Sequence, residues 1–158
     1  CRAAGYRTGH FGKWHLGSVD GRSDVSPGGS GFDRWVSAFN FYENSPLMSS
    51  NGKVVQIKGE SSVATMRSAL QFIRQSQQKP FLAVVWFGSP HNPHVAPKAY
   101  RSLFPNQPKP IQHYYGEIAG IDRAVELLEA ERDENPSDLV GLNLLENLLQ
   151  RNQYKWEC

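Results

Sequence analysis

Apolar side chains recur at intervals of three and four residues in the stretch after residue 62, and this spacing places them on one face of a helix. Ser61 or Ser62 can accept an amide hydrogen bond at its start, and the pattern continues to about Gln77. The apolar positions are Val63, Met66, Leu70 and Ile73. The sequence therefore predicts an amphipathic helix that begins at residue 61 or 62.

Residues 81–87 form an apolar run with the length of a strand. A continuous apolar run is typical of a strand that is covered on both faces, so we expect it at the centre of a sheet. Residues 33–41 predict a further short strand. The Asn51-Gly52 pair predicts a turn that leads into an edge strand over residues 53–58.

Two more helices are expected towards the end of the chain. One apolar stripe comprises Ile118, Ile121, Val125 and Leu128. A second, after Asn135-Pro136, comprises Leu139, Leu142, Leu145 and Leu149. The resulting order of strands and helices favours an α/β layered fold.

Two stretches interrupt the regular elements. Residues 18–31 are rich in Gly and Ser and predict a surface loop. After residues 81–87, two prolines stop any regular element, and His91 and His94 lie beside them. Ligands of open α/β sheets bind at the carboxyl ends of strands, so the two histidines indicate a ligand site.

Composition limits the class of protein. The 158 residues are the size of about one domain, and an apolar share of 39% is enough for one core. No apolar run approaches the roughly 18 residues of a membrane-spanning helix, so we expect no membrane span. Cys1 and Cys158 show no disulfide or metal spacing. A chain that begins with Cys is expected to be processed or part of a longer one.

Charge is distributed unevenly along the chain. Residues 1–115 carry 13 Lys and Arg against 5 Asp and Glu, a net charge of +8, whereas residues 116–158 carry 4 against 10, a net charge of −6. A positive region attracts anionic ligands such as nucleic acid, phosphate or sulfate. The acidic end argues against nucleic acid, and we expect no nucleic-acid partner.

The densest group of chemically active residues lies in the glycine-rich residues 5–17, where Lys13 and His15 are two positions apart. If the chain is extended there, both side chains point the same way. An ammonium and an imidazole on one face can bind a tetrahedral oxyanion and transfer a proton. Neighbouring glycines let the backbone approach such a ligand closely.

These motifs together resemble the sulfatases, which are formylglycine-dependent sulfuric ester hydrolases. The similar segments follow the family order from about residue 2 to residue 128. They are Gly5-Tyr6-Arg7-Thr8, Gly12-Lys13-Trp14-His15-Leu16-Gly17, Gly31-Phe32-Asp33, Lys79-Pro80-Phe81, Pro90-His91-Asn92-Pro93 and residues 115–128 with Ile121-Asp122. The resemblance divides the chain into a partial sulfatase catalytic domain, residues 1–128, and an off-pattern helical tail, residues 129–158.

The resemblance implies an alkaline phosphatase-like α/β fold, a mixed sheet flanked by helices that is incomplete here. It also implies hydrolysis of sulfate esters, carbohydrate sulfates among them, by a formylglycine made from a Cys, with Ca²⁺ polarising the sulfate. Family habit suggests a periplasmic or secreted location.

Site residues follow from the motif positions. The resemblance implies that Lys13 holds the sulfate and the oxygen of the nucleophile. It implies that His15 takes a proton during breakdown of the intermediate, and that His91 contacts the sulfate and the leaving oxygen. His94 lies one step outside the motif and is expected to bind substrate, at most as a specificity residue.

The chain also departs from the family pattern. The Cys-x-Pro/Ala-x-Arg motif of the nucleophile is absent, and Cys1 is rejected as nucleophile because Gly5 stands where the arginine should be. The acidic ligands of Ca²⁺ are not recognisable either, so no metal ligand is assigned. We expect a fragment that has no turnover alone.

Alternatives stay open. The same scaffold could form a non-catalytic anion-binding module or a hydrolase of phosphate or phosphonate esters. His10, His15, His91 and His94 could gather around zinc, although Lys13 would repel the cation. His10 and His113 are otherwise expected on the surface. The large aromatics are expected in the core or a cleft wall.

Overall fold

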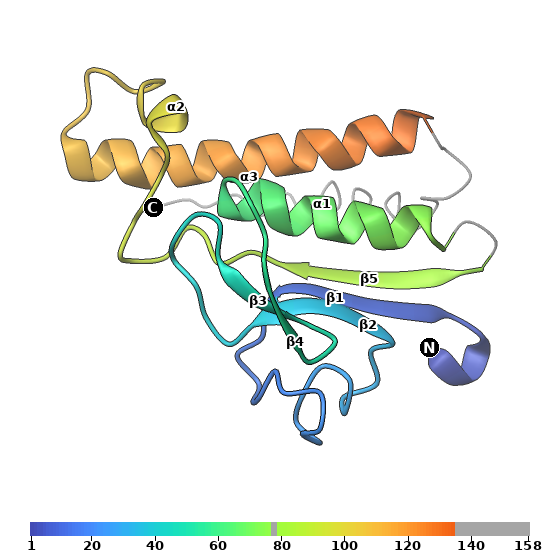
Figure 1. The fold of residues 1–158 in the computed structure, drawn as a ribbon. Coiled ribbons are helices and arrows are strands. Elements are labelled where there is room, and N and C mark those ends of the chain that lie inside the picture. The colour runs from blue at the N-terminus through green and yellow to red at the C-terminus, as the bar shows by residue number, and fades with distance from the viewer. Residues whose placement is uncertain (77–78, 135–158) are drawn as a thin grey trace, which may run out of the picture.

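The computed structural model describes residues 1–76 and 79–134, and a five-stranded mixed sheet forms its centre (Figure 1). The strands are β1 (Arg7–Lys13), β2 (Arg34–Ala38), β3 (Leu47–Ser50), β4 (Lys53–Gln56) and β5 (Phe81–Trp86). Their order in the sheet is β4-β3-β2-β1-β5. β1 runs parallel to both β2 and β5, whereas β3 is antiparallel to β2 and to β4.

Two long helices lie on the same side of this sheet (Figure 1). α1 (Ser61–Arg74) packs on β1 and β5, and α3 (Lys109–Glu134) packs on α1. Two short helices, η1 (Arg2–Ala4) and α2 (Lys98–Arg101), precede β1 and α3. The alternation of strand and helix confirms the α/β class predicted from the sequence.

The main core fills the space between the sheet and the helices. The Phe11 ring of β1 lies 5.6 Å from the Phe72 ring of α1, and both are fully buried. Burying a side chain of this size stabilises the fold by about 1.5–3 kcal/mol. The other buried members are Val36, Ala38, Phe41, Met48, Met66, Ala69, Leu70, Ile73 and Ala124.

The loop over residues 18–31 covers part of the opposite face, as Figure 1 shows. The Trp14 indole Nε1 donates to the Val25 carbonyl at 3.0 Å. A Cβ atom on Gly28 would lie 2.7 Å from the Trp35 ring, so the loop and β2 are in close contact. The predicted loop is confirmed, although Ser26 within it is fully buried.

Most predicted elements are present with adjusted details. The Asn51-Gly52 turn joins β3 to β4, which lies at the sheet edge as expected. The predicted helix begins at Ser61, but the cap is neither Ser61 nor Ser62. The Glu60 carboxylate accepts the Val63 amide at 2.9 Å instead.

The central position predicted for residues 81–87 is wrong for the described residues. β5 pairs only with β1 there and is the terminal strand of the sheet. Its side chains on one face pack against the core, whereas Leu82 and Trp86 on the other are 38% and 45% exposed. An apolar run therefore arises here without full burial on both faces.

α3 confirms the helix expected around residues 118–128 and extends it from Lys109 to Glu134. It therefore continues past residue 128, the boundary expected between domain and tail. The helix predicted after Asn135-Pro136 lies outside the described residues. None of the helices in residues 1–76 and 79–134 is long and apolar enough to cross a membrane.

Candidate functional site

The carboxyl ends of three parallel strands lie along one edge of the sheet. In the register, Lys13 of β1 pairs with Ala38 of β2, and Gly12 pairs with Trp86 of β5. Each of these residues is at or next to the end of its strand. The segments that follow the three strands therefore start side by side, at the edge where ligands of such sheets bind.

Lys13 and His15 occupy this edge in different ways. Lys13 is the half-buried last residue of β1, and the next residue, Trp14, still donates its amide to the Ala38 carbonyl at 2.7 Å. His15 is exposed and lies in a turn, so strand alternation does not fix its direction as expected. Its ring instead packs edge-on against Phe39, with ring centres 4.8 Å apart.

His91 follows β5 on the segment of residues 88–97. It is exposed, and its Nδ1 lies 2.7 Å from the Asn92 carbonyl oxygen. A carbonyl can only accept, so Nδ1 carries the hydrogen and Nε2 is left for a ligand. The His91 ring also contacts the Tyr42 ring at 5.0 Å.

The segment after β2 lies against both histidines. His15 contacts Phe39 and His91 contacts Tyr42, and these two aromatic residues are three positions apart. Three residues span at most about 11 Å of chain, which limits the separation of their Cα atoms. Within the described residues, no hydrogen bond or ion pair joins Lys13, His15 and His91. The three residues therefore follow neighbouring strand ends at one edge of the sheet and are not bonded to one another.

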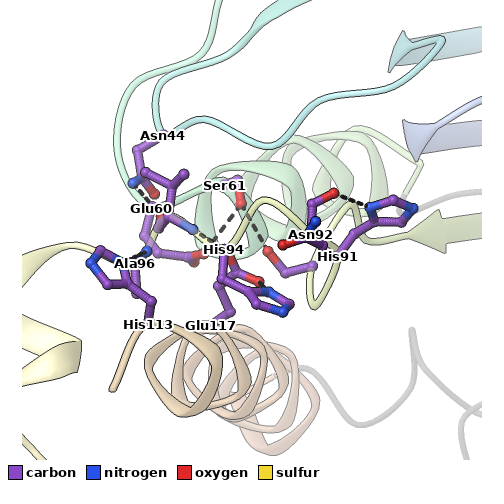
Figure 2. A network of polar contacts seen from close by, with 11 residues as sticks. Asn44, Glu60, Ser61, His91, Asn92, His94, Ala96, His113 and Glu117 are labelled. Atoms are coloured by element: carbon purple, nitrogen blue, oxygen red, sulfur yellow. Dashed lines mark hydrogen bonds and ion pairs between the residues drawn. The ribbon is translucent and has the colours of Figure 1, made fainter. Parts of the chain in front are cut away.

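His94 faces a carboxylate that sequence reasoning missed. Its Nδ1 lies 3.0 Å from Oε2 of Glu117, which is 3% exposed on α3 (Figure 2). The His94 ring also contacts the Tyr114 ring at 5.1 Å. No motif pointed to Glu117, because its partners lie more than 20 positions away in the sequence.

Of the two histidines expected on the surface, one is fully buried and the other is half-buried. His10 is completely buried among the rings of Trp14, Phe32 and Trp86. Burial lowers its pKa to about 4, because desolvation disfavours the charged ring. His113 is half-buried between the Ala96 amide and Arg101. Burial, followed by the charges of Arg101 and Lys109, lowers the pKa of His113 as well.

The described residues do not fit a metal. Among them, no group of three His, Cys, Asp or Glu side chains could hold an ion. His10 is enclosed by aromatic rings, so it does not join the other histidines around zinc as the alternative required. Calcium likewise has no ligand set among the described residues.

Cys1 lies at the opposite edge of the sheet. It precedes β1, and its carbonyl accepts the Tyr6 amide at 3.2 Å beside the amino end of that strand. A strand of seven residues spans about 20 Å, so Cys1 and Lys13 are at different ends of β1. Cys1 therefore does not fit as the precursor of a formylglycine beside Lys13.

Comparison with known proteins identifies the family. Residues 1–137 match the family model described as Sulfatase. The chain belongs to the sulfatase family. The predicted resemblance is therefore confirmed over most of the chain.

Curated relatives are sulfatases of greater length. The ulvan-active sulfatase of Formosa agariphila is 32% identical over 168 residues, which cover 90% of this chain and 31% of the relative. The extracellular sulfatase SULF-1 homolog of Drosophila melanogaster is 31% identical over 115 residues, 65% of this chain and 10% of the relative. The chain thus spans about a third or less of the length of these sulfatases.

A solved structure shares the fold. The crystal structure of Ps i-CgsB in complex with k-i-k-neocarrahexaose matches with a TM-score of 0.77 and 23% identity. The match covers 85% of this chain and 35% of that chain. It confirms the predicted alkaline phosphatase-like mixed sheet flanked by helices.

Proposed function

We propose that the carboxyl edge of the parallel strands binds the sulfate group of a sulfuric ester, and that the chain is part of a sulfatase acting on sulfated carbohydrates. The observation that carries the proposal is the strand register, which brings the end of β1 beside the ends of β2 and β5. Membership of the sulfatase family and the relative named ulvan-active sulfatase support the substrate class.

Each site residue has a proposed role that follows from its chemistry. The Lys13 ammonium supplies a point charge with three donors for sulfate oxygens. His91 turns Nε2 towards the sulfate and the leaving oxygen, because its Nδ1 already donates to Asn92, and Nε2 donates there when both ring nitrogens are protonated. His15 is exposed and can hold or release a proton beside the bound anion. Preorganised donors stabilise the charge that develops on oxygen during sulfate transfer.

Formylglycine and calcium are the groups with which the family cleaves sulfate esters. Because the described residues fit neither, the proposal assigns this chain the binding and orientation of the sulfate. A location outside the cytoplasm, periplasmic or secreted, is also proposed. The relative named extracellular sulfatase supports that location.

Sulfate titration of the whole 158-residue chain tests the proposal. Binding is followed by calorimetry for the wild type, Lys13→Ala and Lys53→Ala. Lys53 is exposed on edge strand β4, so its replacement removes the same charge away from the proposed site. We expect Lys13→Ala to weaken sulfate binding about tenfold or more, because hydrogen bonds to charged groups are among the stronger ones. Lys53→Ala is expected to leave binding unchanged.

Two outcomes would contradict the proposal. Equal losses of sulfate affinity in the two variants would mean that sulfate binding depends only on the net charge of the chain. Phosphate binding tighter than sulfate binding would favour a hydrolase of phosphate or phosphonate esters instead.

A further inference from the structure

Glu117 is a buried carboxylate of α3 that faces the segment carrying His91 (Figure 2). Its Oε1 accepts the Val95 amide at 2.6 Å, and its Oε2 lies 3.0 Å from Nδ1 of His94. Hydrogen bonds to an ionised carboxylate are about twice as strong as neutral ones. One side chain of α3 therefore holds two consecutive residues of the segment.

Other elements hold the same stretch. The Val95 carbonyl accepts from Nδ2 of Asn44 at 2.9 Å, and the Ala96 amide lies 3.1 Å from Nδ1 of His113. The backbone of α3 comes close as well, since a Cβ atom on Gly116 would lie 2.7 Å from the Ala96 Cβ. Both polar backbone groups of Val95 are thus hydrogen-bonded to side chains from outside the segment, although Val95 itself is exposed.

His91 itself has weaker support. Its Nδ1 bonds only to Asn92 of its own segment, and its ring touches Tyr42. Within the described residues, no polar group from another element bonds to its side chain. The position of His91 therefore depends on how the backbone of its segment is held. The Glu117 carboxylate holds that segment by its contacts with His94 and Val95.

Glu117 also determines the protonation pattern of His94. An ionised carboxylate only accepts, so Nδ1 of His94 carries the hydrogen. Whenever the ring is neutral, Nε2 is therefore its unprotonated nitrogen, and the hydrogen bond of Nδ1 fixes that tautomer. Replacing the Glu117 carboxylate by an amide would leave one acceptor oxygen for two donors, Nδ1 of His94 and the Val95 amide.

We infer that Glu117 is a positioning residue of the proposed anion site. It fixes the tautomer of His94 and, through the backbone of residues 94 and 95, the place of His91. The inference rests on the proposed function for the identity of the anion. The tautomer and the placement of His91 do not depend on that function.

The test compares Glu117→Gln with Glu126→Gln in the whole chain. Glu126 lies on the same helix, is exposed and pairs with Arg123, so its variant removes an equal charge elsewhere. Imidazole ¹⁵N resonances report the tautomer of His94 and the surroundings of His91. We expect Glu117→Gln to raise the Nε2–H form of His94, to shift the His91 resonances and to weaken sulfate binding roughly tenfold. Glu126→Gln should change none of these.

The readouts separate the inference from the proposed function. A wild-type chain that binds no sulfate would overturn the proposed function, while the His91 resonances would still decide the inference. Unchanged His91 resonances in Glu117→Gln would overturn the positioning role, even if sulfate binding fell.

A second variant decides the matter if Glu117→Gln does not fold. Glu117→Asp keeps the charge and withdraws the carboxylate by about 1.5 Å, one carbon–carbon bond. We expect it to fold and to shift the His91 resonances. Unchanged His91 resonances in this variant would equally overturn the inference.

Discussion

The Nδ1 atom of His10 lies 2.8 Å from the Oγ atom of Ser37, across the parallel pair of β1 and β2. The Ser37 hydroxyl also donates to the His10 carbonyl at 3.2 Å. The hydroxyl hydrogen is thereby used, so the ring donates from Nδ1 to Oγ. Its Nε2 is buried with no hydrogen-bond partner among the described residues. A proton on Nε2 would therefore be a buried charge without an acceptor.

The free energy of unfolding should decrease as the pH falls, because of the His10 ring. The pKa of His10 is about 4 in the folded chain, below its ordinary value of 6.5. Between these values the unfolded chain binds the extra proton, so stability is complete above pH 6.5 and decreases as the pH falls towards 4. The loss reaches about 3 kcal/mol. Urea unfolding from pH 4.5 to 7.5 measures it. His10→Phe is the control and should flatten this part of the profile; an unchanged slope would contradict the assignment.

Gly12 should tolerate no side chain. Its φ is +101°, and a Cβ atom would lie 1.9 Å from the Trp86 carbonyl oxygen of β5. We expect Gly12→Ala to lower the free energy of unfolding by roughly 3 kcal/mol or more, from strain and from separation of the two strands. Gly5→Ala is the matched control, since Gly5 has φ +81° with open space around it. It should cost only about 1 kcal/mol. Similar losses in urea unfolding would show that the Trp86 contact is unimportant.

The cap of α1 gives a second matched pair. Glu60 accepts the Val63 amide, so Glu60→Ala should lower the free energy of unfolding by about 1–2 kcal/mol. The Ser62 hydroxyl is buried and has no hydrogen-bond partner in the part of the chain that the structure describes. Ser62→Ala should therefore be neutral or stabilising. Thermal unfolding of both variants measures the effects. A larger loss of stability in Ser62→Ala than in Glu60→Ala would indicate that the serine caps the helix.

The 158-residue chain is expected to bind sulfate without hydrolysing an aryl sulfate. Cys1 precedes the amino end of β1, whereas the proposed site is at the carboxyl end. Cys1→Ser should accordingly leave sulfate affinity unchanged. A chromogenic aryl sulfate assay and a sulfate titration check both points. Turnover that Cys1→Ser abolishes would mean that the thiol reaches the anion.

Local sequence patterns predicted where helices and strands lie better than they predicted how each of them is packed. The three- and four-residue spacing of apolar positions predicted α1, and the Asn51-Gly52 turn predicted the β3–β4 hairpin. The same evidence misplaced β5, because an apolar strand can pack one face on helices and leave Leu82 on the other exposed. The cap was missed because glutamate is not among the residues preferred as helix caps, whereas the two serines that follow it are.

The sequence by itself determined the family, the main helices and strands, and the residue types at the sheet edge. These depend on order and spacing along the chain, which the motifs around Lys13, His15 and His91 preserve. Only the tertiary structure decided that His10 is buried and that Glu117 holds the segment after β5. Both depend on contacts between residues more than 20 positions apart, and no local pattern encodes which distant side chains meet.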